Sequence, residues 1–343
     1  MCGSMPGPAA TLCGMAPRPA IRYLSAADVH AAMPDLPEQL ALAERTLRAL
    51  TGSADLPPKI GVHPRPAGSF AHAMPAWLRG PGPAMTGDLL GIKWVSGFPD
   101  NRLRSIPAIH ATLLLSDATT GEPRAILDAA GITAVRTAAV SGVAIAHWAP
   151  VSIDGPLSVT LVGAGVQGDS HITMLAGVLP GCRVIIHDRD SDRAEGLAAR
   201  SRSLAVFDDV ATSADAVAAV RGADVVITLV SFGPDRQSIP AEAFGRARLV
   251  VAVDYDMCLP ASVARDADLF LVDELGQFLA NRTGDVFRGY PDPVAIMGAR
   301  LDDPHPDGRV VVTHLGVGLA DVVFGDAILR AAEQLGLGVL LPR

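Results

Sequence analysis

The chain has 343 residues, 49% of them hydrophobic, and a formal net charge of −8 at pH 7. This length predicts two domains with a large buried core. The acidic balance, without any basic block, argues against a nucleic-acid partner. Four cysteines without a CxxC pair argue against a disulfide framework or a metal site, and for a reducing, cytoplasmic compartment.

The first third of the chain predicts an α+β arrangement. Residues 1–20 are rich in Gly, Pro and Ala and are expected to be a flexible leader. Helix signals run from Ser25 to Leu50. The segments KIGVH, GSFAHAM and LLGIKWV are expected to be strands, and IHATLLLSD and PRAILDA a hairpin. An Ala-rich helix, ITAVRTAAVSGVAIAHWA, is expected to end before Pro150. No apolar run is long and uninterrupted enough to predict a membrane span.

A different pattern of predicted secondary structure begins at Leu157. Buried strands such as SVTLV, RVIIHD, ADVVITLVS and RLVVAVDYD alternate with helices, which favours a doubly wound parallel sheet. Residues 278–306 are polar and loop-rich. The end of the chain predicts a strand, a glycine turn and a long terminal helix.

A glycine-rich motif follows the first of these strands. Gly163, Gly165 and Gly168 form GxGxxG together with Val166 and Gln167, between a strand and a helix. In this context the glycines allow a tight turn, close approach to a pyrophosphate, and close helix–strand packing. The motif therefore predicts a Rossmann dinucleotide site.

The second strand of this region ends at Asp188. A carboxylate there can accept the ribose hydroxyls of adenosine and would repel a 2′-phosphate. It favours NAD(H), with NADP(H) as the alternative because Arg189 and Arg193 lie close by.

Three ionisable residues stand inside apolar segments: Lys93 in GIKWVSGFP, Arg136 in ITAVRTAA and Asp256 in VAVDYD. Burial of an unpaired charge is costly, so each needs a partner. A structural carboxylate is the simple explanation for one such cation. Two cations beside a nucleotide domain favour a substrate carboxylate.

Several motifs resemble the ornithine cyclodeaminase/mu-crystallin family in the family's own order. They are PPK at 57–59, HAMP at 72–75, KWVSGFP, TAVRTAAVSG, GAGVQG and the closing GVGLADV, and they span roughly residues 57–330. The resemblance implies a homodimer with a nicotinamide cofactor. It also implies a Rossmann domain at 150–311 and an α+β substrate and dimerisation domain built from both chain ends, 21–145 with 312–343.

The resemblance also implies roles for individual residues. Asp256, Lys93 and Arg136 are expected to be catalytic, with Asp256 handling the substrate amine. The expected substrate-binding residues are Lys59, His72, Met74, Lys93 and Arg136. The expected cofactor-binding residues are Gly163, Gly165, Val166, Gln167, Gly168, Asp188, Arg189, Thr137 and Val230.

The chain departs from the ornithine enzymes at three places. His72 replaces a Glu, Pro260 replaces a Lys, and Thr313 to Gly316 replace Asp-Ser-Val-Gly. The preferred hypothesis is therefore hydride transfer at the α-carbon of an amino or imino acid by a reductase or dehydrogenase. An ornithine-type cyclodeaminase that recycles NAD, and a non-catalytic crystallin-type ligand binder, stay open. Tyr255 and His314 are left without a role.

Overall fold

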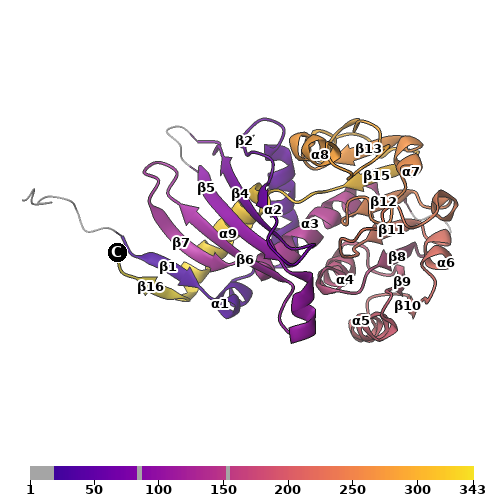
Figure 1. The fold of residues 1–343 in the computed structure, drawn as a ribbon, viewed down its shortest axis with the longest axis horizontal. Helices are drawn as coiled ribbons and strands as arrows, with labels where there is room; N and C mark the ends of the chain where they lie inside the picture. The colour runs from indigo at the N-terminus through magenta and orange to yellow at the C-terminus, as the bar shows by residue number, and fades with distance from the viewer. Residues whose placement is uncertain (1–18, 83–86, 152–154) are drawn as a thin grey trace, which may run out of the picture.

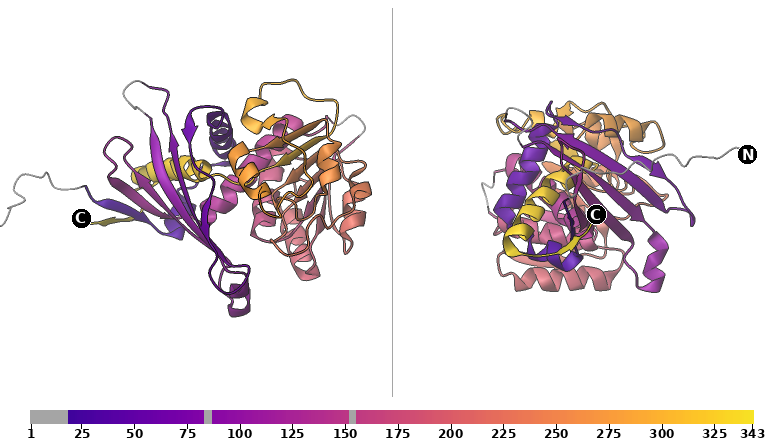
Figure 2. Two further views of the ribbon diagram at one scale, coloured as in Figure 1. Left: turned by 45° about the horizontal axis from the view of Figure 1, so that its top comes forward. Right: turned by 90° about the vertical axis from the view of Figure 1, so that its left-hand side faces the viewer.

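The computed structural model describes residues 19–82, 87–151 and 155–343. Almost all of the predicted leader, residues 1–18, lies outside these ranges. In the described residues the chain forms two eight-stranded sheets that lie side by side, with helices between them (Figures 1 and 2).

The first sheet has the strand order β16-β1-β7-β6-β5-β4-β2, with β3 paired to β4. Its long strands largely alternate buried and partly buried residues, as in a sheet that is covered more closely on one face. The predicted hairpin of β6 and β7 is confirmed. The predicted helix from Ser25 to Leu50 is two helices, because Pro34 and the capping residue Asp35 interrupt it. The strands are β1 Ile21–Leu24, β2 Ala54–Asp55, β3 Ile60–Val62, β4 Phe70–Leu78, β5 Leu89–Gly97, β6 Ile109–Ser116, β7 Pro123–Asp128 and β16 Val339–Leu341.

Helices α1, α3 and α9 pack on the inner face of this sheet, and α2 packs on α3 and α9 (Figure 2). Helix α3 is long and apolar enough to span a bilayer by length and composition, but 61% of its 18-residue window is buried inside the molecule. It is therefore placed as a core helix between the two sheets. The bounds are α1 Ala26–Ala31, α2 Leu36–Ala49, α3 Ala130–Trp148 and α9 Gly318–Leu335, with the 3₁₀ turn η1 at Pro99–Arg104.

The second sheet is entirely parallel, in the order β10-β9-β8-β11-β12-β15-β13-β14. The order reverses between β8 and β11, which is where doubly wound sheets bind ligands. This confirms the predicted Rossmann fold. The strands are β8 Ser158–Val162, β9 Arg183–His187, β10 Asp209–Thr212, β11 Val225–Thr228, β12 Leu249–Ala252, β13 Leu269–Val272, β14 Ala295–Ile296 and β15 Val310–Thr313.

Two features of this half differ from the sequence prediction. Helix α8 covers Leu275–Arg282, the start of the segment expected to be loop. Strand β15 belongs to the parallel sheet, so the chain leaves that sheet after Thr313 rather than at residue 312. The remaining elements are α4 Val166–Val178, α5 Ser191–Ser203, α6 Ala216–Arg221, α7 Ala261–Arg265, η2 Ala241–Phe244 and η3 Met297–Ala299.

Candidate active site

A buried cluster of charges lies where β5, α3 and α9 meet. Lys93 Nζ is 2.7 Å from Asp321 Oδ2, and Arg136 Nε is 3.4 Å from Asp321 Oδ1. All three side chains are almost fully buried. Lys93 also lies 3.3 Å from the hydroxyl of Thr133 in the first turn of α3. The structure therefore brings together the two predicted cations, and it adds a carboxylate that the sequence analysis did not single out.

Asp321 could have been found from the sequence. It is the only acidic residue in the apolar run VVVTHLGVGLADVVFG, and it lies in the first turn of α9. A carboxylate there is favoured by the positive end of the helix dipole. Because one carboxylate serves two cations, the cluster keeps an excess positive charge that suits a second, external carboxylate.

The pKa of Lys93 is lowered to about 7. Loss of hydration on burial is the largest cause; the nearby Asp321 opposes it, and Arg136 adds to it. The charge on this lysine therefore changes within the physiological range. The pKa of His72 on β4 is lowered to about 4 by burial and by Lys59, so His72 is neutral at pH 7.

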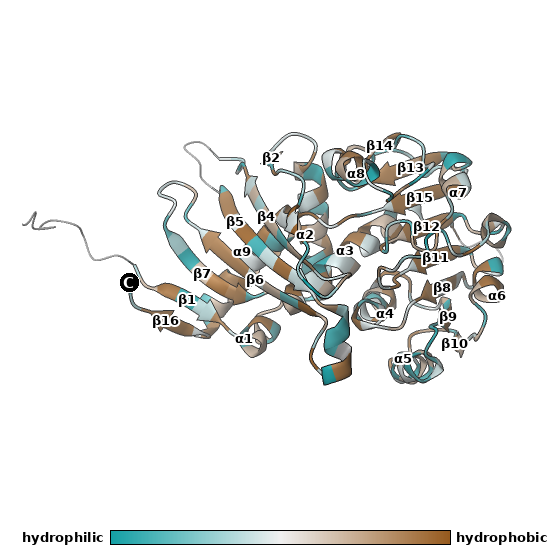
Figure 3. Cartoon of the chain, viewed as in Figure 1, coloured by the Kyte–Doolittle hydropathy of each residue, from teal (hydrophilic) through white to brown (hydrophobic). Residues whose placement is uncertain are grey.

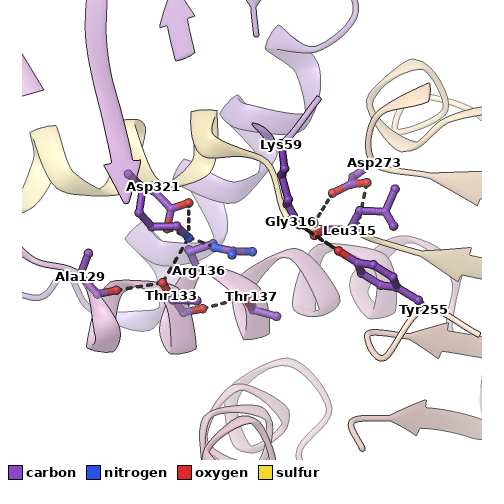
Figure 4. A network of polar contacts seen from close by, with 11 residues as sticks. Lys59, Ala129, Thr133, Arg136, Thr137, Tyr255, Asp273, Leu315, Gly316 and Asp321 are labelled. Carbon is purple, nitrogen blue, oxygen red and sulfur yellow. Dashed lines mark hydrogen bonds and ion pairs between the residues drawn. The ribbon is translucent and has the colours of Figure 1, made fainter. Parts of the chain in front are cut away.

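A third cation, Lys59, lies between the charge cluster and the Rossmann half (Figure 4). Its Nζ donates to the carbonyl of Leu315 at 2.5 Å and lies 2.9 Å from the hydroxyl of Tyr255. The same loop is anchored by the buried carboxylate of Asp273, which accepts the backbone N–H groups of Leu315 and Gly316. Lys59 therefore faces the site without a carboxylate of its own among the described residues.

Gly316 allows the loop to approach the cluster. Its φ is +74°, and a Cβ there would lie 2.6 Å from an Arg136 guanidinium nitrogen. The loop that carries Leu315 therefore packs directly on Arg136. Met74, also predicted at the substrate site, is buried on β4 and lies against Gly318 at the start of α9.

Asp256 is placed differently from Lys93 and Arg136. Its carboxylate is fully buried, is ion-paired with Arg236 and accepts the N–H of Phe287 at 2.9 Å. Arg236 was not expected from the sequence, because only the loop after β11 brings it to this position. The amine-handling role of Asp256 stays a prediction.

A buried hydrogen-bonded chain joins α4, α3 and the end of β15. The Ser141 hydroxyl lies 2.8 Å from Nε2 of His171 and 2.8 Å from Nε2 of His314. The Nδ1 of His171 must donate to the carbonyl of Gln167, 2.7 Å away, so its Nε2 accepts from Ser141. Ser141 in turn accepts from Nε2–H of His314. Burial lowers the pKa of both histidines, which are neutral at pH 7. His314, left without a role from the sequence, thus belongs to this chain.

The glycine-rich turn has the geometry that a dinucleotide requires. A Cβ at Gly163 would lie 2.7 Å from the Leu229 carbonyl, and one at Gly168 would lie 2.8 Å from the Gly163 carbonyl. Gly165, in contrast, faces open space. The side-chain oxygen of Gln167 is buried without a hydrogen-bond partner in the described residues, so a ligand donor would satisfy it. These residues fit a dinucleotide.

Of the other predicted cofactor residues, Asp188 contacts this turn directly. Asp188 accepts the N–H groups of Ala164 and Asp190, which orients its carboxylate at the end of β9. Val166 and Arg189 are exposed beside the turn. Thr137 donates to the Thr133 carbonyl in α3, and Val230 donates its N–H to the buried Asp254. In residues 19–82, 87–151 and 155–343, no group of three metal-ligating side chains is found.

Comparison with known proteins finds relatives in one family. Residues 22–241 match the model of the ornithine cyclodeaminase/mu-crystallin family. The chain is 34% identical to the nodulation efficiency protein NfeD of Rhizobium meliloti, over 94% of this chain and 98% of that protein. It is 33% identical to an L-lysine cyclodeaminase of Streptomyces rapamycinicus, over 72% and 73% of the two chains. It is 31% identical to a Δ1-pyrroline-2-carboxylate/Δ1-piperideine-2-carboxylate reductase of Azospirillum brasilense, over 68% and 69%.

Solved structures share the fold. One is the Δ1-pyrroline-2-carboxylate reductase of Thermococcus litoralis in complex with NADH and L-proline, with a TM-score of 0.76 and 21% identity, over 93% of this chain and 99% of that one. Another is an archaeal alanine dehydrogenase dimer with bound NAD, with a TM-score of 0.77 and 22% identity, over 94% and 98%.

The position of Asp188 predicts the cofactor preference. Asp188→Ser removes the charge that would repel a 2′-phosphate, so the preference for NADH over NADPH is expected to fall by about tenfold or more, which is about 1.4 kcal/mol. Titration of nicotinamide fluorescence with both cofactors measures this. Tighter binding of NADPH than NADH by the unmodified protein would instead assign the dominant role to Arg189 and Arg193.

The lowered pKa of Lys93 predicts a pH-dependent affinity for carboxylates. Only the protonated lysine attracts the ligand, so the dissociation constant is flat below pH 7 and rises between pH 7 and 9, by up to about tenfold per unit. Pyrrole-2-carboxylate, which cannot accept a hydride at a C=N bond, can be titrated by calorimetry. Lys93→Arg stays charged and should flatten the profile. A flat profile in the unmodified protein would contradict the assignment.

Proposed function

The chain belongs to the ornithine cyclodeaminase/mu-crystallin family, and we propose that it is a nicotinamide-dependent reductase of α-imino acids. The observation that carries this proposal is the buried cluster of Lys93 and Arg136 around Asp321. Its surplus positive charge suits the carboxylate of an imino acid. Lys59 lies close enough to add a third donor from the side of the Rossmann half.

When bound, the cofactor supplies the hydride that such a reduction needs. The residues of the chain position the substrate for this transfer. Arg136 and Lys93 hold the carboxylate, and their shared partner Asp321 fixes both cations before the substrate arrives. Because these cations come from rigid elements, β5 and α3, the α-carbon of the substrate is held in one orientation. Burial of the cluster keeps water away from it.

A redox-neutral cyclodeaminase is the second candidate. It is favoured by the 33% identity to an L-lysine cyclodeaminase and by the retention of Asp256. The two candidates differ in their net chemistry. A reductase consumes one NADH for each substrate molecule, whereas a cyclodeaminase releases ammonia from a diamino acid and leaves the NADH concentration unchanged.

The reductase proposal is tested by mixing Δ1-pyrroline-2-carboxylate with NADH and following the absorbance at the nicotinamide band. NADH is expected to be consumed in a one-to-one ratio. Lys93→Met and Arg136→Met should each cost about 2–5 kcal/mol of transition-state stabilisation, a loss of tens- to thousands-fold in kcat/KM. NADH affinity should change little, which serves as the control for folding. Ammonia release from L-lysine or L-ornithine without NADH consumption would support the second candidate instead.

We further propose that the protein is a homodimer through the outer face of the first sheet. Helices lie on the inner face, whereas the register places Trp94 on β5 and Ile60 and Val62 on β3 together on the outer face, where all three are exposed. Strand β5, at the centre of this arrangement, is largely hydrophobic (Figure 3). A patch of this kind is unusual on a monomer. The alanine dehydrogenase of similar fold is a dimer.

Light scattering is expected to give twice the chain mass at micromolar concentration. Trp94→Glu places a charge in the proposed interface and should shift the mass toward that of one chain, because an unpaired charge is costly to bury. Leu204→Glu, at an exposed position beyond α5, is the matched control and should leave the mass unchanged. A monomer mass for the unmodified protein would refute the proposal.

A further inference from the structure

The ion pair of Arg236 and Asp256 occupies a carboxylate that a ligand could otherwise use. Asp256 is 0% exposed, and both of its oxygens are engaged, one by Arg236 and the other by the N–H of Phe287. The Arg236 side chain is 26% exposed, so it covers the carboxylate from the solvent side. Neither partner has a role in the cluster around Asp321.

Aromatic contacts connect this pair to the substrate site. Tyr255 precedes Asp256 and has the left-handed φ of +64°, which is strained for an aromatic residue. Its hydroxyl lies 2.9 Å from Lys59 Nζ, and its ring stacks on Phe287 with a centroid distance of 5.6 Å. Phe232, from the same loop as Arg236, packs edge-on against Tyr255 at 4.9 Å and is 53% exposed. The pair therefore lies directly behind an aromatic wall that borders Lys59.

The other buried carboxylates near Lys59 are also engaged. Asp321 binds Lys93 and Arg136, and Asp273 accepts the N–H groups of Leu315 and Gly316. Within the described part of the chain, the site offers a ligand three cations and an aromatic wall but no carboxylate that is free of a partner. The three cations can bind the carboxylate of a substrate. A distal ammonium group on the substrate, in contrast, would find no carboxylate to pair with.

Resting on the proposed function, we propose that Arg236 is a specificity-determining residue that restricts the enzyme to α-imino and α-amino acids with an uncharged side chain. By holding Asp256, Arg236 removes the counterion that a distal ammonium group would need. To bind a diamino acid, the protein must move Arg236 off a fully buried carboxylate, which is unfavourable. An apolar side chain or ring instead packs on Phe232 and Tyr255 without breaking the pair.

The matched probes are L-norvaline and L-ornithine, which have the same linear carbon chain and differ by a terminal ammonium group. Each is measured as a competitive inhibitor of Δ1-pyrroline-2-carboxylate reduction, and by calorimetry with the NAD-loaded protein. L-norvaline is expected to bind at least tenfold more tightly than L-ornithine. Equal or tighter binding of L-ornithine, or no binding of L-norvaline while the imino acid is reduced, overturns the inference.

Variants identify the residue responsible. Arg236→Gln frees the carboxylate of Asp256 and should reduce the tenfold difference in affinity between L-norvaline and L-ornithine, mainly because L-ornithine binds more tightly. Arg236→Lys keeps the positive charge and should preserve this difference in affinity. Arg236→Gln combined with Asp256→Asn removes both charges and should restore discrimination against L-ornithine. NADH affinity reports folding of each variant. An unchanged ratio in folded Arg236→Gln overturns the role of Arg236. Absence of any imino-acid reduction by the unmodified protein rejects the proposed function itself, and this inference with it.

Discussion

The ion-paired carboxylate of Asp321 is the interaction on which the site depends. It joins three elements that are far apart in the sequence: β5 through Lys93, α3 through Arg136, and α9 through Asp321 itself. Three buried charges without this arrangement would be unfavourable, and removal of one partner from such a cluster typically costs about 3–5 kcal/mol. These ion pairs add to the apolar packing of α9, which lies against β4, β5 and β6 of the first sheet.

Helix α3 connects the charge cluster in the first half of the molecule to the glycine-rich turn in the Rossmann half. Its first turn carries Thr133 beside Lys93, its second turn carries Arg136, and its third carries Ser141, which bridges His171 and His314. His171 in turn holds the carbonyl of Gln167 in the glycine-rich turn. The charge cluster and the glycine-rich turn are thus connected through a single buried helix, and a displacement of either would disturb packed, hydrogen-bonded neighbours.

The balance of charge gives the site its chemical character. All three cations come from the first half of the molecule, and Lys59 contacts Tyr255 and the Leu315 carbonyl at the border with the Rossmann half. Each neighbouring carboxylate already has partners. Under the proposed function, the positive charge attracts the carboxylate of the substrate at one end of the site. At the other end, the strained Tyr255 and the exposed Phe232 offer apolar surface to whatever the acid carries. In the proposed function, the carboxylate and the side chain of the substrate are therefore recognised by different elements of the fold.

The sequence by itself determined the Rossmann half, the glycine-rich turn, Asp188, and the unusual Lys93 and Arg136, because these depend on local pattern: strand–glycine–helix order, and single charges within apolar runs. The tertiary structure alone decided their partners. Asp321 meets Lys93 across more than 200 residues, β15 inserts between β12 and β13, and the loop after β11 delivers Arg236 to Asp256. These depend on which distant elements pack together, and a residue's own neighbours in sequence carry no signal of a contact made through the fold.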